Sequence, residues 1–422
     1  MKAVVSAAGE GVRMSPLTRN RSKHMLPVGG KPILHHVLET IKRCGIKEIL
    51  MVVGYKKEVI RDYFQDGTDM GLRITYLFQE RALGTASAVI LAEDHVNEDF
   101  LGVNGDLLFT DEALRTLLKA HKGKPAATIA SAKVDEPSNY GMIERDGDRV
   151  TRLVEKPRSD DVSNKLANTG MYVFSPEIFK SIKEISRSIR GEYELTDAIM
   201  RLIEKGNIVK TAEIQAKDWF DVGRPWDLLE ANRRAILQSD FKIEGIVEEG
   251  AHLVGPVKVG RGARVRSGAY VEGPSIIGDE SDVGPNCYIR FHTTLGKGTR
   301  IGNACEVKNS LIMDGTHVGH LSYIGDSVIG SECNLGAGTL LGNLRLDDKT
   351  VKVKVRDRVI DSGRRKLGAI IGDKVKTGIN ASLMPGVKVG NNSWVGPGVV
   401  LHEDLPDDVV IFQKQSFEVK PI

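Results

Sequence analysis

The stretch SAAGEGVRMSPLTRNRSKHMLP, residues 6–27, decides how the first half of the chain folds. Residues 2–8, which lead into it, are small and β-branched, as is typical of a strand buried on both faces of a sheet. Such a strand delivers the chain to a loop at its carboxyl end, where ligands bind in open α/β sheets. Gly9 and Gly11 permit a positive-φ backbone that points N–H groups at an anion, and Arg13 is the first of four cations that follow. The pattern predicts a polyphosphate site, although a glycine turn after a strand is often only a turn.

The same stretch fits neither of two common phosphate-binding motifs. Met14 stands where the dinucleotide fingerprint needs its third glycine, and no Gly-Lys-Ser/Thr sequence is present, which excludes a P-loop. The string GEGVRMSPLT followed by SKHMLPVGGKP instead resembles the signature of the sugar-1-phosphate nucleotidyltransferases. The resemblance implies that Arg13 and Lys23 grip a nucleoside triphosphate. Ser22 departs from the pattern, because the family usually has proline before the lysine.

Composition narrows the class of protein. The chain has 422 residues, enough for two or three domains, and its net charge of +3 gives no broad field for nucleic acid or membranes. The four cysteines are widely spaced and form no C-x-x-C pair, which argues against zinc and against a disulfide framework. No segment approaches the roughly 20 apolar residues of a membrane span. We expect a cytoplasmic enzyme that acts on small molecules, with no nucleic-acid or membrane partner.

Helical and strand patterns alternate along residues 31–79. Apolar residues recur at helical spacing over 31–45, with Gly45 at the position of a C-terminal cap. The apolar runs 48–54 and 74–79 are typical of strands. This alternation predicts a Rossmann-like α/β domain with a mixed sheet covered by helices, which we place at residues 1–225.

Segments beside other predicted strands complete the nucleotide site. Gln79 closes a strand before ALGTASAV, residues 82–89, and the pair resembles the base-binding segment of the family. Backbone readout of a pyrimidine does not separate uracil from thymine, so the nucleotide is UTP or dTTP. Asp106 and Asp221 each end an apolar strand near a glycine, and the resemblance implies that both hold Mg²⁺, an ion bound through one or two carboxylates and phosphate oxygens. The implied nucleotide contacts are Ala8, Gly9, Gly11, Gln79, Gly84, Thr85 and Asp106.

Three further segments, NYGMIE (139–144), VEKP (154–157) and NTGMYVF (168–174), match sugar-contacting segments of the same family. Each places a polar residue or a glycine beside a predicted strand. Any one of them alone is an ordinary loop, but their shared order favours a sugar phosphate site. The implied contacts are Gly141, Glu155, Lys156 and Asn168.

The second half of the chain carries a six-residue repeat, which follows an expected linker helix at 226–240. From Leu253 to Met313 every sixth residue is aliphatic or methionine, and a second run covers 371–401. This period is typical of a parallel β-helix whose periodic residues point inward, which we place at 241–401. Such coils resemble the left-handed hexapeptide-repeat acyltransferases, which are commonly trimers, so the resemblance implies a homotrimer.

One segment of the repeat, CEVKNSLIMDGTHVGHLSYIGDSVIGSECNLGAGTLLGN (305–343), resembles the acetyltransferase half of the bifunctional enzymes that form UDP-N-acetylglucosamine. A lone histidine in a β-helix is most often a surface residue. The resemblance instead makes His320 the general base for the amine of glucosamine-1-phosphate, a role that imidazole can fill near neutral pH. Tyr323 and Asn343 would place the amino sugar. The other implied contacts are Arg290 and Lys308 for the sugar phosphate, and Asn334 and Ala337 for acetyl-coenzyme A.

A basic insertion, residues 344–366, interrupts the repeat and alternates charge with valine, which predicts a projecting hairpin. It is either a solvated loop or a set of cations that place Lys349 and Lys352 beside phosphates of the acceptor or the coenzyme. The bacterial bifunctional enzymes have a shorter loop here, which limits the comparison. The tail, 402–422, shows no repeat and is expected to cap the coil.

Three functions remain open on these observations. The preferred one is a bifunctional enzyme that acetylates glucosamine-1-phosphate and couples the product to UTP, giving UDP-N-acetylglucosamine and pyrophosphate. The alternative is a glucose-1-phosphate thymidylyl- or uridylyltransferase with a purely structural β-helix, because the motifs of the first domain fit it equally well. A regulatory scaffold would show a degraded site, yet Arg13, Lys23, Asp106 and Asp221 are all present.

Overall fold

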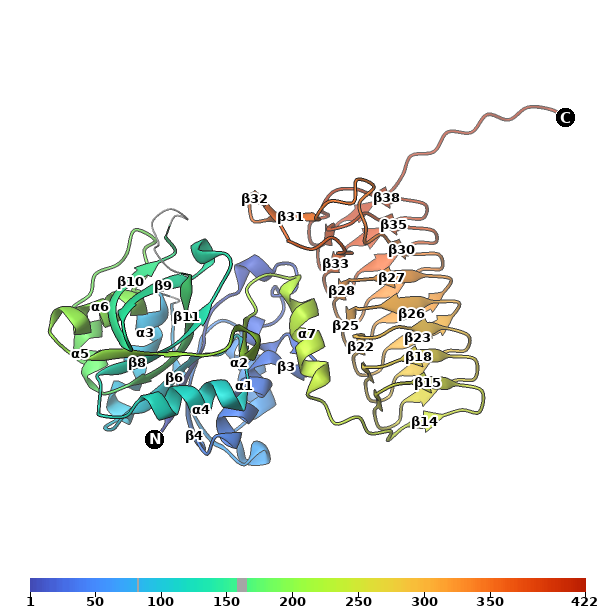
Figure 1. The fold of residues 1–422 in the computed structure, drawn as a ribbon. Coiled ribbons are helices and arrows are strands. Elements are labelled where there is room, and N and C mark those ends of the chain that lie inside the picture. The colour runs from blue at the N-terminus through green and yellow to red at the C-terminus, as the bar shows by residue number, and fades with distance from the viewer. Residues whose placement is uncertain (82, 158–164) are drawn as a thin grey trace. The chain divides into compact units, whose positions relative to one another are not determined.

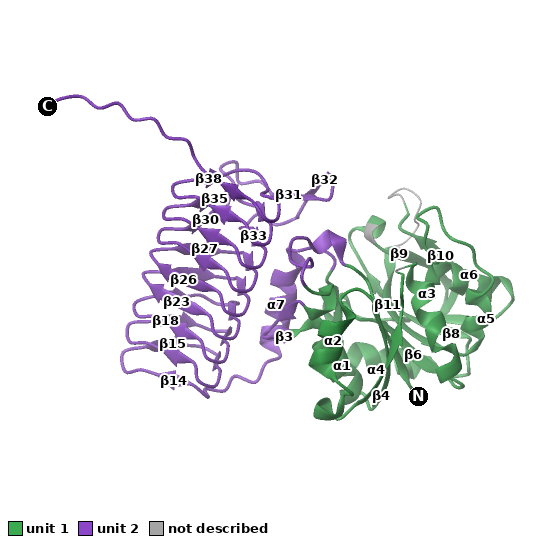
Figure 2. Ribbon diagram, turned by 180° about the vertical axis from the view of Figure 1, so that it is seen from behind, with its two compact units in different colours: residues 1–10, 21–25, 32–222 green, residues 11–20, 26–31, 223–422 purple. Residues whose placement is uncertain are grey.

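The computed structural model describes residues 1–81, 83–157 and 165–422, and the chain divides into two compact units (Figure 2). The first unit comprises Met1–Glu10, Arg21–Met25 and Pro32–Val222, and the second comprises Gly11–Asn20, Leu26–Lys31 and Gly223–Ile422. Ala82, which opens the predicted base-binding segment, lies outside the described residues. None of the described helices has the length and apolar character needed to span a bilayer.

A mixed nine-stranded sheet forms the centre of the first unit (Figure 1). Its strands are β1 (Ala3–Ala7), β4 (Glu48–Val53), β5 (Arg73–Phe78), β6 (Phe100–Asn104), β8 (Ala127–Lys133), β9 (Gly141–Asp146), β10 (Arg149–Glu155), β11 (Leu166–Phe174) and β12 (Val209–Glu213). They lie in the order β5-β4-β1-β6-β11-β8-β12-β10-β9. β1 runs parallel to β4 and β6, whereas β11 runs antiparallel to β6. The predicted α/β class is confirmed.

Helices cover this sheet, and identifiable residues set the end of α1 and the start of α4. They are α1 (Ile33–Arg43), α2 (Lys57–Phe64), α3 (Thr85–Val89), α4 (Asp111–Ala120), α5 (Glu177–Ile182) and α6 (Leu195–Glu204). Gly45, with φ of 91°, follows α1 in the left-handed conformation that ends many helices. The hydroxyl of Thr110 accepts a hydrogen bond from Ala113 N at 3.2 Å and so caps the start of α4. The residues of β1 are almost entirely buried, as expected for a central strand covered on both faces.

A left-handed parallel β-helix forms most of the second unit and follows α7 (Asp227–Leu237), the expected linker helix. Its strands are two to four residues long and form three stacked sheets, from β14 (Ile246–Val247) to β39 (Val410–Ile411). Inward aliphatic residues such as Val265, Val283 and Ile301 are fully buried and lie in register on successive turns. The six-residue spacing therefore builds one continuous core.

Two successive turns of the coil are each one residue shorter than the turns before them. Register partners stand 18 residues apart from Tyr270 to Glu306, but 17 apart from Glu306 to Leu340. The inward residue after this change is Ile312, which is fully buried in the coil core. The prediction that Met313 points into that core is therefore wrong. A single shortened corner shifts the phase, which strict six-residue counting cannot detect.

The basic insertion folds as expected, whereas the tail does not. β31 (Lys352–Val355) and β32 (Arg358–Asp361) form an antiparallel hairpin, as predicted for the insertion. Val353 and Val355 are buried on one face of β31, and Lys352 and Lys354 are exposed, which follows the two-residue period of a strand. β39 pairs with β37 (Trp394–Val395), so the coil continues into the tail that we expected to lack repeats.

Candidate functional site

Lys23 and Asp106 form an ion pair in the first unit, between the signature stretch and the turn after β6. Lys23 Nζ contacts Asp106 Oδ2, and 8% of the lysine side chain and 21% of the aspartate side chain are exposed. Burial alone would raise the pKa of the Asp106 carboxyl, but the charges of Lys23 and His24 and the hydrogen bond from Lys23 hold it below its usual value. Asp106 is thus an ionised oxygen donor, and Lys23 is held at a defined position.

Asp106 lies in the turn just before one strand of a two-stranded sheet, and Asp221 ends the other strand. β13 (Trp219–Asp221) runs antiparallel to β7 (Leu107–Phe109), and Val222 N donates to Asp106 O at 3.2 Å. Among the described residues, no cluster of three or more His, Cys, Asp and Glu side chains is arranged to hold a metal. Two carboxylates that leave other positions to water and phosphate oxygens are a donor set typical of Mg²⁺. The residues present therefore fit that ion.

His24 lies beneath the Asp106 turn and should make stability depend on pH. It is buried, its Nδ1 lies 2.9 Å from Ser22 Oγ, and burial lowers its pKa to about 4. The unfolded chain therefore binds a proton that the folded chain does not, and the free energy of unfolding should fall by up to about 3 kcal/mol between about pH 6.5 and pH 4. Denaturant titrations over this range should show a smaller fall for His24→Asn. If the free energy of unfolding depended equally on pH in wild type and His24→Asn, His24 would not be the source of this pH dependence.

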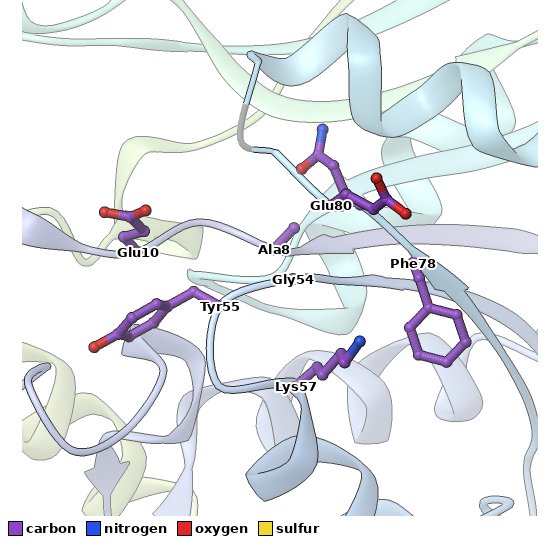
Figure 3. A pocket seen from close by; sticks show the side chains of 8 residues that line it. Ala8, Glu10, Gly54, Tyr55, Lys57, Phe78 and Glu80 are labelled. Atoms are coloured by element: carbon purple, nitrogen blue, oxygen red, sulfur yellow. The ribbon is translucent and has the colours of Figure 1, made fainter.

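An open cleft contains two of the predicted nucleotide-binding residues, Ala8 and Gln79 (Figure 3). Its other lining residues are Glu10, Gly54, Tyr55, Lys57, Phe78 and Glu80. Gln79 Nε2 donates to Ser87 Oγ at 2.7 Å, and that hydroxyl donates to Gly84 O at 2.7 Å. The start of α3 thus orients the Gln79 amide.

Gly84 and Thr85 are tied to the segment before α6. A Cβ on Gly84 would lie 2.5 Å from Tyr193 O, and its φ of 109° is rarely adopted by other residues, so glycine is required there. The Thr85 hydroxyl accepts from Leu195 N at 3.0 Å. The close backbone approach at Gly84 therefore holds the start of α3 against the segment before α6, while the Thr85 hydroxyl supports the start of α6.

The two glycines of the signature stretch behave differently. Gly11 has φ of 64° and its carbonyl accepts from Met14 N at 2.8 Å, which turns the chain into the short helix η1 (Val12–Met14). Gly9 does not adopt a positive φ, contrary to expectation, although nothing lies within 4 Å of the place where its Cβ would stand. Arg13 lies in η1 and is exposed. The tight left-handed turn is therefore made by Gly11 alone of this pair.

The four predicted sugar-contacting residues meet at one edge of the large sheet. Gly141 pairs with Glu155 between β9 and β10, and a Cβ on Gly141 would lie 3.1 Å from Glu155 Oε2 and 3.8 Å from Asn168 Cβ. Lys156 Nζ lies 3.7 Å from Glu155 Oε1. Asn168 Nδ2 donates to Tyr172 OH at 2.8 Å, which fixes its amide. A carboxylate, a cation and an amide thus stand together beside a glycine.

Sequence reasoning missed Arg190 and Glu194 at this edge. Arg190 Nη1 lies 3.2 Å from Glu155 Oε1 and 3.3 Å from Glu194 Oε1, so one cation positions two carboxylates. Burial raises the pKa of the Glu194 carboxyl, although Arg190 opposes the shift. The signal available in the sequence was the charged segment GEYELTD (191–197), because a carboxylate that becomes buried there requires a charged partner.

On the coil, the residues predicted to bind the amino-sugar phosphate form one cluster. β21 (Tyr288–Ile289), β24 (Glu306–Lys308) and β27 (Tyr323–Gly325) are successive rungs of one sheet, so Arg290 and Lys308 follow each other along it. Arg290 Nη1 donates to Glu306 Oε1 at 3.0 Å, and its buried Nε has no hydrogen-bond partner among the described residues. Asn343 Nδ2 lies 3.2 Å from Tyr323 OH. The cluster therefore presents two cations, a phenol and an amide.

His320 and the predicted coenzyme residues lie on the adjoining sheet. His320 ends β26 (His317–His320) and is exposed, and Tyr323 begins the next strand on the other side of the corner. β29 (Asn334–Leu335) pairs with β26, and Gly338 N donates to His320 O at 3.2 Å. Asn334 and Ala337 thus lie on the turn of the coil that stacks next to His320.

The insertion leaves and rejoins the coil at this cluster. Leu367 N, just after the insertion, donates to Asn343 O, just before it, at 2.9 Å. Lys349 and Lys352 both lie on the insertion and are exposed. Their predicted contact with substrate phosphates stays a prediction.

Known protein families match residues of both units. The Nucleotidyl transferase family matches residues 2–238, the GMPPB C-terminal domain matches 271–377, and the Bacterial transferase hexapeptide (six repeats) matches 368–403. A crystal structure of a protein from Bacillus anthracis, provisionally named a glucose-1-phosphate thymidylyltransferase, aligns with a TM-score of 0.52 at 30% identity and covers 58% of this chain and 98% of its own. That likeness is limited to part of the chain.

Relatives that match over nearly their full length are named as bifunctional proteins. The "Bifunctional protein GlmU" of Methanococcus maripaludis strain C7 is 44% identical over 420 residues, which is 99% of each chain. The "Bifunctional sugar-1-phosphate nucleotidylyltransferase/acetyltransferase" of Sulfurisphaera tokodaii is 39% identical over 96% of this chain and 98% of its own. The similarity extends from the signature stretch through the coil. The chain belongs to the family of bifunctional sugar-1-phosphate nucleotidylyltransferase/acetyltransferases.

Proposed function

We propose that the chain acetylates glucosamine-1-phosphate with acetyl-coenzyme A and then joins the product to UTP, giving UDP-N-acetylglucosamine and pyrophosphate. The observation that carries the proposal is the cluster around Lys308, Tyr323 and Asn343 on the coil, in a chain that also holds the Lys23–Asp106 pair. A coil that served only for assembly would not need cations and an amide gathered at one corner. The alternative of a purely structural β-helix is less supported, because relatives of full length are named bifunctional, one of them as a nucleotidylyltransferase/acetyltransferase.

In acetyl transfer, the amine of glucosamine-1-phosphate attacks the thioester carbonyl of acetyl-coenzyme A. His320 takes a proton from the amine as the new C–N bond forms, and the C–S bond breaks to release coenzyme A. Arg290 and Lys308 bind the phosphate of the sugar, and Tyr323 and Asn343 hold the amino sugar in place. Fixed cations and amides of this kind act by orienting the reactants before the reaction.

In nucleotidyl transfer, a phosphate oxygen of N-acetylglucosamine-1-phosphate attacks the α-phosphorus of UTP. The new P–O bond forms as the bond between the α-phosphorus and the bridging oxygen breaks, and pyrophosphate leaves. Arg13 and Lys23 bind the triphosphate, and Glu155 and Asn168 bind hydroxyls of the sugar. Mg²⁺ held by Asp106 and Asp221 would neutralise charge on the phosphate oxygens.

The proposal extends to assembly and location. Exposed Tyr270, Leu340 and Val400 lie on the same sheet of the coil, which supports an interface with other copies of the chain in a homotrimer. We place the enzyme in the cytoplasm, where its proposed substrates UTP and acetyl-coenzyme A occur.

Two product assays test the proposal. Purified protein should release free thiol from acetyl-coenzyme A only when glucosamine-1-phosphate is present. Pyrophosphate release, measured for four nucleoside triphosphates against several sugar-1-phosphates, should be fastest for UTP with N-acetylglucosamine-1-phosphate. Absence of thiol release would leave only the nucleotidyl half, and a preference for GTP with mannose-1-phosphate would contradict the base assignment around Gln79.

A further inference from the structure

The shortened corner of the coil buries a carboxylate beside the acetyl-transfer cluster. Both 17-residue turns lose their residue at this corner, after Lys308 and after Gly325. Asn309 and Asp326 occupy the two corners, both with positive φ, at 43° and 49°. Asp326 is only 4% exposed. Shortening the corner on two stacked turns therefore places this side chain inside the edge of the coil.

Side chains of the proposed site converge on the Asp326 carboxylate. Asn343 Nδ2 donates to Asp326 Oδ2 at 2.6 Å, and Lys308 Nζ lies 3.5 Å from the same oxygen. Asn309 Nδ2 donates to Asp326 Oδ1 at 2.6 Å. A buried carboxylate that accepts two hydrogen bonds and pairs with one cation helps to fix each of these three groups in place.

The neighbouring glycine makes room for this arrangement. A Cβ on Gly325 would lie 2.5 Å from Tyr323 OH and 2.6 Å from Asn343 Nδ2, so both groups occupy the space that a side chain would fill. Tyr323 OH and Asn343 Nδ2 are themselves 3.2 Å apart. Residue 325 must therefore be small for the phenol and the amide to meet beside Asp326.

Three other aspartates of the coil accept hydrogen bonds from backbone N–H groups. Asp279 Oδ1 accepts from Arg261 N at 2.9 Å, Asp314 Oδ1 accepts from Lys297 N at 2.8 Å, and Asp373 Oδ1 accepts from Ser331 N at 2.9 Å. These carboxylates cap backbone turns and so stabilise the coil. The hydrogen bonds and ion pair described for the Asp326 carboxylate all come from side chains. The difference separates Asp326 from these three aspartates.

We infer that Asp326 is a positioning residue for acetyl transfer, a role that rests on the proposed function. Because Asn343 Nδ2 is committed to Asp326 and Tyr323 OH, its Oδ1 is left as the acceptor for the amine of the sugar. Asp326 also holds one face of the Lys308 ammonium, whose remaining N–H groups are left for the phosphate. The carboxylate thus sets the direction of both groups and touches neither the amine nor the thioester.

The test is Asp326→Asn, which keeps shape and suits a positive φ but replaces one acceptor oxygen with a donor. We expect kcat/KM for glucosamine-1-phosphate to fall by about 10- to 100-fold, with KM for acetyl-coenzyme A and the UTP reaction unchanged. Asp279→Asn is the matched control, and it should lower the melting temperature without changing kcat/KM per folded enzyme. Equal kcat/KM values in wild type and Asp326→Asn would overturn the inference.

A double-mutant cycle distinguishes positioning from a general loss of structure. If Asp326 acts through Asn343, the losses for Asp326→Asn and Asn343→Ala should not multiply, and the double variant should be at least threefold more active than their product predicts. Multiplying losses, or equal loss of both activities, would count against positioning. Failure of the proposed function is separate, because wild-type protein would then release no coenzyme A at all, and the role inferred for Asp326 would fall with it.

Discussion

Replacement of His320 by alanine should lower kcat for acetyl transfer by about 10²- to 10⁴-fold, the usual effect of removing a general base. The backbone at this position does not depend on the imidazole, because His320 O accepts from Ser322 Oγ at 2.7 Å and from Gly338 N at 3.2 Å. The side chain is exposed, so its loss should cost little stability. Coenzyme A release at saturating substrates, followed with a thiol reagent, measures the effect directly.

His252 provides the matched control for this variant. It is an exposed histidine on β15 (His252–Val254), and three strands of its sheet, β18 (Tyr270–Glu272), β21 and β24, separate it from β27. His252→Ala should retain acetyl transfer within about twofold, and His320→Ala should retain pyrophosphate release. Loss of both activities in His320→Ala would refute two independent sites, and full acetyl transfer would remove His320 from the mechanism.

The sequence predicted those parts of the structure that depend on local pattern. The six-residue spacing predicts the β-helix directly, because each inward aliphatic residue packs on the inward residue one turn away, as Val265 does on Val283. The alternation of valine and charge in β31 likewise gave the hairpin. The predicted sugar residues Gly141, Glu155 and Asn168 were also brought together, because the edge strand β9 pairs with both β10 and β11.

Features that depend on register between turns could not be predicted in the same way. The prediction for Met313 failed because the corner after Lys308 is one residue shorter, a change that shifts phase without leaving a gap in the sequence. The burial of Asp326 follows from that same corner. Arg190 was missed because its partner Glu155 is 35 residues away in the chain, and their pairing follows only from the fold.

Replacement of Asp106 by asparagine should lower nucleotidyl transfer by about 10³-fold while acetyl transfer continues, because one of the two carboxylates offered to Mg²⁺ is lost. The variant also leaves Lys23 with a largely buried charge and no carboxylate partner at Asp106 Oδ2, so some loss of stability is expected. Initial rates of pyrophosphate release at saturating UTP and Mg²⁺ measure the catalytic effect. The melting temperature measures the structural one.

Asp221→Asn separates these two effects, because it removes the other carboxylate and keeps the Lys23–Asp106 pair. If the aspartates act as a metal pair, Asp221→Asn should lose activity to a similar degree, and its requirement for Mg²⁺ should shift to higher concentration. Asp111→Asn is the matched control, because Asp111 begins α4 and pairs with Arg43 at 2.8 Å, on the surface.

Wild-type activity in Asp221→Asn beside an inactive Asp106→Asn would mean that Asp106 acts by holding Lys23, with no paired carboxylate. The depressed pKa of Asp106 is consistent with either role, since an ionised carboxylate can hold a lysine or a metal ion, and only the second variant distinguishes them.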